Sequence, residues 1–131
     1  MPIELKILAW SAVLLLFYII AATRSATAQY GTKWNMGPRD EAVPAPSPAT
    51  GRLIRAQANF LETYPIAIIA LLGVVVAGRT SPTTALGGWI WLGARIVYWP
   101  LYAAGIPLIR TIAWGVSIVG LAMVIWPLLF S

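Results

Sequence analysis

The sequence predicts an all-α fold, an integral membrane four-helix bundle of up-down topology. Two observations predict it. Hydrophobic residues make up 60% of the 131 residues and charged residues only 10%, whereas a soluble domain carries about 25% charge. The hydrophobic residues also gather into four runs, each long enough for a helix that crosses about 30 Å of hydrocarbon. A chain of this length holds one domain, so we expect residues 1–131 to form a single transmembrane domain.

The four spans are expected at about residues 5–23, 52–78, 84–104 and 109–130. The first and fourth spans have uncharged centres, the second begins with polar turns, and the third carries one charge, Arg95. Tryptophans lie near several span ends, as is typical of side chains that anchor at the membrane interface. The last three spans are joined by short connections, which favours antiparallel neighbours in an up-down bundle.

The first span is expected to be retained in the membrane. Residues 25–28, SATA, look like the small-residue cleavage site of a signal peptide. However, Glu4 offsets Lys6 in the segment before the apolar run, so that segment has no positive bias. The apolar run is also long for the hydrophobic region of a signal peptide.

Residues 24–51 are expected to form a long irregular loop, because they contain several prolines. Lys and Arg residues are more numerous on the side of this loop and of the last connection than on the opposite side. They are Arg24, Lys33, Arg39, Arg52, Arg55 and Arg110 on the one side, and Lys6 and Arg79 on the other. The positive-inside rule therefore places the long loop in the cytoplasm and both termini outside.

Polar side chains recur at helical spacing in the second and third spans. In the second span they are Arg52, Arg55, Asn59 and Glu62. In the third span they are Arg95, Tyr98 and Tyr102. Intervals of three and four residues place each set on one stripe of its helix. We expect the two stripes to meet in a cleft between the helices that opens towards the cytoplasm.

Glu62 and Arg95 are the charges that lie deepest in these two spans. Each is about 15 Å from the cytoplasmic face at the rise of an α-helix. Either charge alone would cost roughly 2.5–3.5 kcal/mol in the membrane, so we expect the two to form a buried ion pair. A purely structural role for this pair, with Asn59 adding an interhelical hydrogen bond, is the alternative.

The residue counts exclude several kinds of chemistry. The sequence contains no cysteine and no histidine, which excludes thiol nucleophiles, disulfides, Cys/His zinc sites and imidazole catalysis. It contains four acidic residues, and we therefore expect no metal site. The net charge of +5 is attributed to membrane topology, and no nucleic-acid partner is expected.

The predicted cleft is cationic towards the cytoplasm, so a small polar anion is its natural occupant. Because the protein is poorly equipped to supply a nucleophile, a substrate that brings its own thiol would provide one. Arg110, at the mouth of the cleft, could stabilise the thiolate, since a nearby arginine lowers the pKa of a thiol. Taken alone, Arg110 is also explained as one more cytoplasmic positive charge.

Two segments resemble motifs of a known family. Residues 55–65, RAQANFLETYP, resemble the second-helix signature of the MAPEG superfamily (membrane-associated proteins in eicosanoid and glutathione metabolism). Residues 94–102, ARIVYWPLY, followed by Arg110, resemble the third-helix motif of the family and its following loop. The sequence looks closer to bacterial members than to the animal enzymes, which implies a multi-pass protein of the bacterial inner membrane. With the orientation given by the positive-inside rule, both termini would lie in the periplasm.

The resemblance implies a homotrimer that uses glutathione as a co-substrate, bound between neighbouring subunits near the cytoplasmic side. The second substrate would be a lipophilic electrophile or a lipid hydroperoxide from the bilayer. The implied glutathione-binding residues are Arg55, Gln57, Asn59, Glu62, Tyr98 and Tyr102. Arg110 matches the arginine proposed to stabilise the thiolate, and Arg95 matches the buried arginine of the third helix.

One branch of the superfamily binds lipid and activates a partner without turnover. A non-catalytic trimeric scaffold or lipid-binding accessory protein is therefore the alternative to an enzyme. A transporter is disfavoured, because a single buried ion pair provides little of a translocation path. The sequence departs from the family pattern at Gly51, where many members have an acid, and at Thr63, where some have an aromatic or amide ligand.

Overall fold

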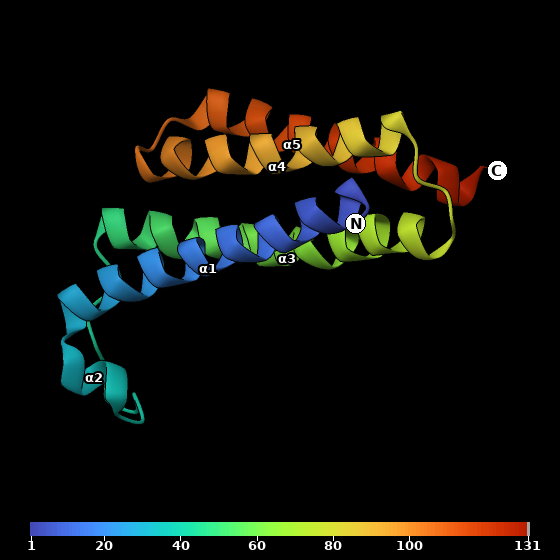
Figure 1. Ribbon diagram of the computed structural model, residues 1–131. Helices are drawn as coiled ribbons and strands as arrows, with labels where there is room; N and C mark the ends of the chain where they lie inside the picture. The colour runs from blue at the N-terminus through green and yellow to red at the C-terminus, as the bar shows by residue number, and fades with distance from the viewer. Residues whose placement is uncertain (131) are drawn as a thin grey trace.

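The computed structural model describes residues 1–130, and all regular structure in that range is α-helical, which confirms the predicted fold class. The helices are α1 (Ile3–Tyr30), α2 (Thr32–Met36), α3 (Pro48–Val76), α4 (Pro82–Ala103) and α5 (Pro107–Leu129). Figure 1 shows α4 and α5 side by side in one layer, with α1 and α3 in a second layer below them. The short helix α2 projects from the end of the bundle at which α1 ends.

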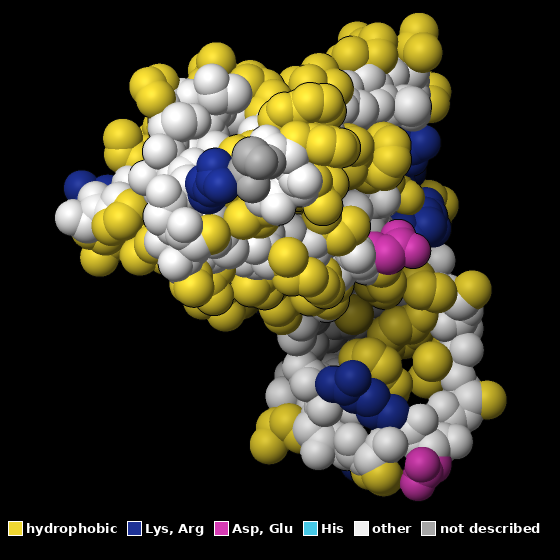
Figure 2. All heavy atoms as spheres, turned by 90° about the vertical axis from the view of Figure 1, so that its right-hand side faces the viewer, with side chains coloured by type: hydrophobic (Ala, Val, Ile, Leu, Met, Phe, Trp, Pro, Cys, Tyr) yellow, Lys and Arg dark blue, Asp and Glu magenta, His cyan; other side chains and the backbone are white. Residues whose placement is uncertain are grey.

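Three of the described helices, α1, α3 and α5, are long and apolar enough to cross a membrane. α4 has 22 residues, which corresponds to about 33 Å of helix. α4 is not one of these three helices, and it contains Arg95 as well as several glycines and tryptophans. Large apolar side chains remain exposed on all of the long helices, and Figure 2 shows hydrophobic side chains around the bundle with few charges among them. The chain is therefore a multi-pass membrane protein whose apolar surface faces lipid.

Local sequence signals define where the helices begin and end. A proline occupies an early position of α3, α4 and α5, where its missing N–H is not needed. The Ser81 hydroxyl accepts a hydrogen bond from the Thr84 backbone N–H and the Thr84 hydroxyl accepts one from the Ser81 N–H, which forms a capping box. Gly78 and Gly105 follow α3 and α4 with φ values of 68° and 76°, which stop the helices and reverse the chain.

α4 and α5 approach each other at a pair of glycines. A Cβ atom on Gly120 would lie 2.6 Å from the Gly87 carbonyl oxygen and 2.7 Å from the Trp91 backbone nitrogen. A Cβ atom on Gly87 would likewise lie 2.7 Å from the Gly120 carbonyl oxygen. Small residues at such a crossing allow the two backbones to pack directly, which is the usual way of joining helices in a membrane.

The segment between the first two spans is more ordered than predicted. The expected loop over residues 24–51 is wrong at both ends, because α1 continues to Tyr30 and α3 already begins at Pro48. Residues 24–30 contain neither glycine nor proline, so the helix continues until Gly31, which has a φ of 97°. The Gln29 side chain then holds the segment just before α3 against the end of α1, since its amide donates to the Ala45 carbonyl and accepts from the Ser47 N–H.

A buried contact joins α1 to the start of α4. Glu4 is 3% exposed, and its carboxylate accepts a hydrogen bond of 2.6 Å from the hydroxyl of the fully buried Thr84. The carboxylate also lies at the N-terminal end of α4, where the helix dipole favours negative charge. Glu4 therefore helps to hold the two layers together at the end of the bundle opposite to α2.

Candidate functional site

A cleft of about 250 Å³ lies between α3, α4 and α5, towards the end of the bundle that carries α2. Its lining residues are Asn59, Tyr98, Tyr102, Arg110, Thr111 and Trp114. Four of them were proposed from the sequence, and they come from three different helices. Thr111 and Trp114 were not proposed, although Trp114 follows Arg110 by four residues and so lies on the same face of α5, with Thr111 about 100° around the helix from Arg110. None of the lining residues is acidic, so the cleft is cationic.

Tyr102 lies at the centre of the polar contacts of the cleft. The Arg110 guanidinium lies over the Tyr102 ring, 4.6 Å from its centroid. Arg55, which is exposed on α3, donates a hydrogen bond of 3.3 Å from its Nε to the Tyr102 hydroxyl. The Tyr98 ring meets the Tyr102 ring edge to face, with the centroids 5.5 Å apart. Two cations and two phenols thus converge at the mouth of the cleft.

Arg52 has a structural contact instead of a place in the cleft. Its Nε donates a hydrogen bond of 2.9 Å to the Ala103 carbonyl, in the last turn of α4. A carbonyl there has no partner within its own helix, so the arginine satisfies it and its charge also complements the helix dipole.

The prediction of an ion pair between Glu62 and Arg95 is wrong: in the structure of residues 1–130 the two side chains do not meet. Arg95 is fully buried, and its Nη1 donates a hydrogen bond of 2.8 Å to the Asn59 side-chain oxygen while its Nη2 donates to the Thr63 hydroxyl. Glu62 is exposed. Asn59 and Thr63 are four residues apart and share a face of α3, whereas Glu62 is rotated by about 100° from Thr63. The rotation of α3 therefore presents the two neutral side chains to α4.

Neutral groups surround the charge of Arg95. Besides the contacts to Asn59 and Thr63, its guanidinium lies 4.9 Å from the ring centroid of Tyr98 and 5.3 Å from that of Phe60. Its Nε has no hydrogen-bond partner among residues 1–130. Hydrogen bonds and aromatic faces therefore replace the expected carboxylate, and the positive charge below the cleft is not cancelled.

Gln57 lies on the other flank of α3. It is two residues from both Arg55 and Asn59, which is about 200° around the helix. There it lines a second cleft of about 250 Å³, formed with α1 and the region of α2. Arg39, treated above only as a cytoplasmic charge, lines this second cleft, and its guanidinium lies 4.4 Å from the ring centroid of Trp34. One chain thus does not bring Gln57 together with the other proposed glutathione-binding residues.

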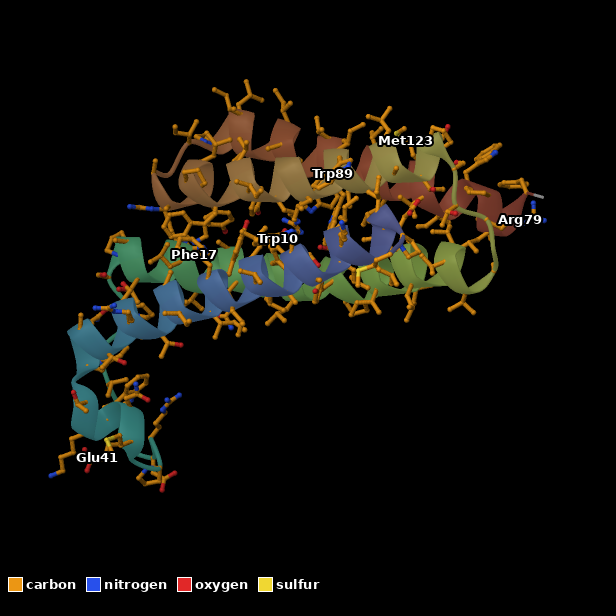
Figure 3. The ribbon with its side chains drawn as sticks, viewed as in Figure 1. Trp10, Phe17, Glu41, Arg79, Trp89 and Met123 are labelled. Carbon is orange, nitrogen blue, oxygen red and sulfur yellow. The ribbon has the colours of Figure 1, made fainter. Side chains whose placement is uncertain are left out.

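The face formed by α1 and α4 is apolar. Figure 3 shows Trp10 and Phe17 on α1 and Trp89 on α4. With four aliphatic neighbours, these side chains line a groove of about 380 Å³ that carries no charged residue. Its composition matches the acyl region of a bilayer.

Comparison with known proteins decides the family. A model described as the MAPEG family matches residues 7–130, nearly the whole chain. The chain belongs to the MAPEG family. Members of this family are membrane proteins with glutathione-related transferase, peroxidase or related functions, and they generally form trimers. Comparisons with curated proteins and with solved structures give no match.

Proposed function

We propose that this MAPEG protein is a glutathione-dependent membrane transferase or peroxidase that acts on lipophilic electrophiles or lipid hydroperoxides. The observation that supports it most directly is the cationic cleft, where Arg55, Arg110 and the two tyrosines surround one opening. Arginine keeps its charge at all relevant pH values and binds carboxylates in two-point geometry. A small anionic peptide with a thiol fits such a cleft.

In this proposal the cleft residues have separate roles, together with Arg55 and Glu62, which lie outside its lining. Arg55 holds a carboxylate of glutathione, and Asn59 and Glu62 bind its peptide backbone and amino group. Arg110 stabilises the thiolate, because a positive charge close to the sulfur favours the ionised form. The tyrosines position the sulfur for attack. The thiolate then forms a bond to the electrophile, and the leaving group departs with the electron pair of the broken bond.

We also propose that the site is completed by a second copy of the chain in a homotrimer. The first cleft and the second cleft, which contains Gln57 and Arg39, lie on opposite flanks of α3. In a closed ring of identical chains, each interface joins two different faces of the subunit. Such an interface would bring Gln57 of one subunit to Asn59 of the next, and the exposed Glu62 would then be covered.

The proposed location is the bacterial inner membrane, with the termini in the periplasm and the α2 region in the cytoplasm. The excess of Lys and Arg around α2 and the start of α5 supports this orientation. Glutathione would then enter from the cytoplasm, where the cleft opens. The lipophilic substrate would arrive sideways from the bilayer, along the apolar surface of the helices.

A glutathione titration of the purified protein tests the proposal. Saturable stabilisation against heat at millimolar concentration or below is expected, because a ligand that binds only the folded state raises its melting temperature. Conjugation of 1-chloro-2,4-dinitrobenzene with glutathione then reports turnover. A flat thermal response together with no conjugation would contradict the proposal and favour the non-catalytic scaffold.

Two arginine variants serve as a matched pair in this assay. Arg110→Gln removes the charge at the cleft, whereas Arg79→Gln removes an exposed charge at the opposite end of the bundle. Only Arg110→Gln is expected to change turnover. Equal effects of the two substitutions would mean that Arg110 acts only through the net charge of the protein.

A further inference from the structure

Asn59 lies between the buried Arg95 and the cleft. Arg95, on α4, is 0% exposed and holds Asn59 in two ways. Its Nη1 donates to the Asn59 side-chain oxygen at 2.8 Å, and its Nη2 donates to the Asn59 backbone carbonyl at 3.3 Å. Asn59 is half-buried and lines the cleft from α3. One side of its amide therefore meets Arg95, and the other side is available to a ligand.

The chemistry of arginine determines which side of the Asn59 amide is available to a ligand. A guanidinium carries only N–H donors and no acceptor. The atom of the Asn59 amide that faces Arg95 must therefore be the oxygen, since the reversed amide would oppose N–H donors to N–H donors. The Nδ2 group, with its two N–H bonds, is left on the other side of the amide.

Thr63 fixes the guanidinium in turn. Its hydroxyl lies 3.3 Å from the Phe60 carbonyl and 3.4 Å from the Asn59 carbonyl, to which it donates. With its hydrogen directed to the backbone, the Thr63 oxygen accepts from the Nη2 of Arg95. The stacked faces of Phe60 and Tyr98 limit the remaining freedom of the guanidinium.

We propose that Arg95 is a positioning residue that holds the Asn59 amide with its Nδ2 group towards the cleft. This part of the cleft is then a hydrogen-bond donor, and it binds an acceptor oxygen of the ligand, a carbonyl or a carboxylate. The inference rests on the proposed function in so far as glutathione is the ligand with which it is tested. Arg95 itself does not touch the ligand and acts through Asn59.

The sequence offers a direct spectroscopic test, because the chain contains only two asparagines, Asn35 and Asn59. Protein labelled with ¹⁵N-asparagine shows the side-chain amide signals of these two residues. Asn35 serves as an internal reference, since its Nδ2 donates to the Thr27 hydroxyl near α2. We expect the side-chain signal of Asn59 to shift saturably with glutathione, with the same midpoint as the thermal stabilisation.

Two substitutions separate positioning from a merely structural role. Asn59→Asp keeps the shape of the side chain and gives Arg95 a carboxylate partner, so the melting temperature should be equal or higher. The same substitution removes the N–H donors, and the affinity for glutathione should fall at least about tenfold. In Arg95→Lys the two-point hold on Asn59 is lost, so its side-chain signal should move without ligand and the affinity should fall.

The outcomes distinguish this inference from the proposed function. An Asn59→Asp variant that binds glutathione as tightly as the wild type would overturn the inference, as would an Asn59 signal that stays still while glutathione stabilises the protein. In both cases the proposed function would stand. If glutathione gives no stabilisation of the wild type, the proposed function fails, and the ligand-free spectra decide the orientation. An Asn59 signal unchanged by Arg95→Lys would then refute the positioning role.

Discussion

The glycine contact between α4 and α5 gives a stability prediction that can be worked from the structure. In Gly120→Ala the new methyl group would lie 2.6 Å from the Gly87 carbonyl oxygen and 2.7 Å from the Trp91 backbone nitrogen. Both neighbours are backbone atoms, so no side-chain rotation can relieve the overlap, and the helices must separate. Overpacking of this kind typically costs about 1–3 kcal/mol. Alanine also favours the helix over glycine by about 1 kcal/mol, so we expect a net loss of up to about 2 kcal/mol.

Gly115→Ala is the matched control, because Gly115 is on the same helix and a Cβ atom there would meet nothing within 4 Å. The measurement is thermal unfolding of both variants and the wild type in the same detergent. Gly120→Ala should unfold a few degrees below the wild type, at about 2–8 °C per kcal/mol, and Gly115→Ala at or above it. If the two variants are equally stable, the close approach of α4 and α5 does not exist in the protein.

Three further predictions concern the site and the bundle. Arg110→Gln should lower kcat by about 100-fold with little change in the Kd for glutathione in a titration; the opposite split would make Arg110 a binding residue. Gln57→Leu should weaken glutathione binding although Gln57 lies outside the first cleft of its own chain, because in the proposed homotrimer the neighbouring subunit contributes it. An unchanged Kd by thermal titration would argue against a shared site. Thr84→Val should destabilise the bundle by about 1–3 kcal/mol, since the buried carboxylate of Glu4 loses its donor, whereas Thr83→Val, at an exposed position, should leave the melting temperature unchanged.

Hydropathy and spacing predicted the parts of the structure that depend on one helix at a time. Uncharged runs identify the long helices, and intervals of three and four residues place side chains on one face regardless of the partner. For this reason Asn59, Tyr98 and Tyr102 meet in the cleft as expected. A single sequence contains less information about how one helix is rotated against another. Whether Glu62 or the adjacent Thr63 faces Arg95 depends on that rotation, and the spacing pattern could not decide it.

The predicted boundaries of the loop around α2 were wrong for a different physical reason. Proline content predicted an irregular segment correctly in residues 38–47, whereas Pro48 begins α3. It could not locate the end of α1, because residues 24–30 are compatible with a helix and continue it until Gly31. The position of Gln57 shows a similar limit, since a family resemblance assigns a residue to a site without stating which subunit supplies it.

The failed ion pair bears directly on the proposed function. A carboxylate on Arg95 would cancel its charge, and the base of the cleft would then be close to neutral. The observed partners, Asn59 and Thr63, satisfy the N–H groups and leave the positive charge in place. With Arg55 and Arg110 at the mouth and no acid among the lining residues, the negative charge that complements these arginines has to come from the ligand or from a neighbouring subunit.

In the low dielectric of the membrane the uncompensated charge of these arginines is costly, so we expect the cleft to bind anions more strongly than neutral analogues. Glutathione and its dimethyl ester make that comparison, and equal affinity for the two would show that the arginines do not determine binding.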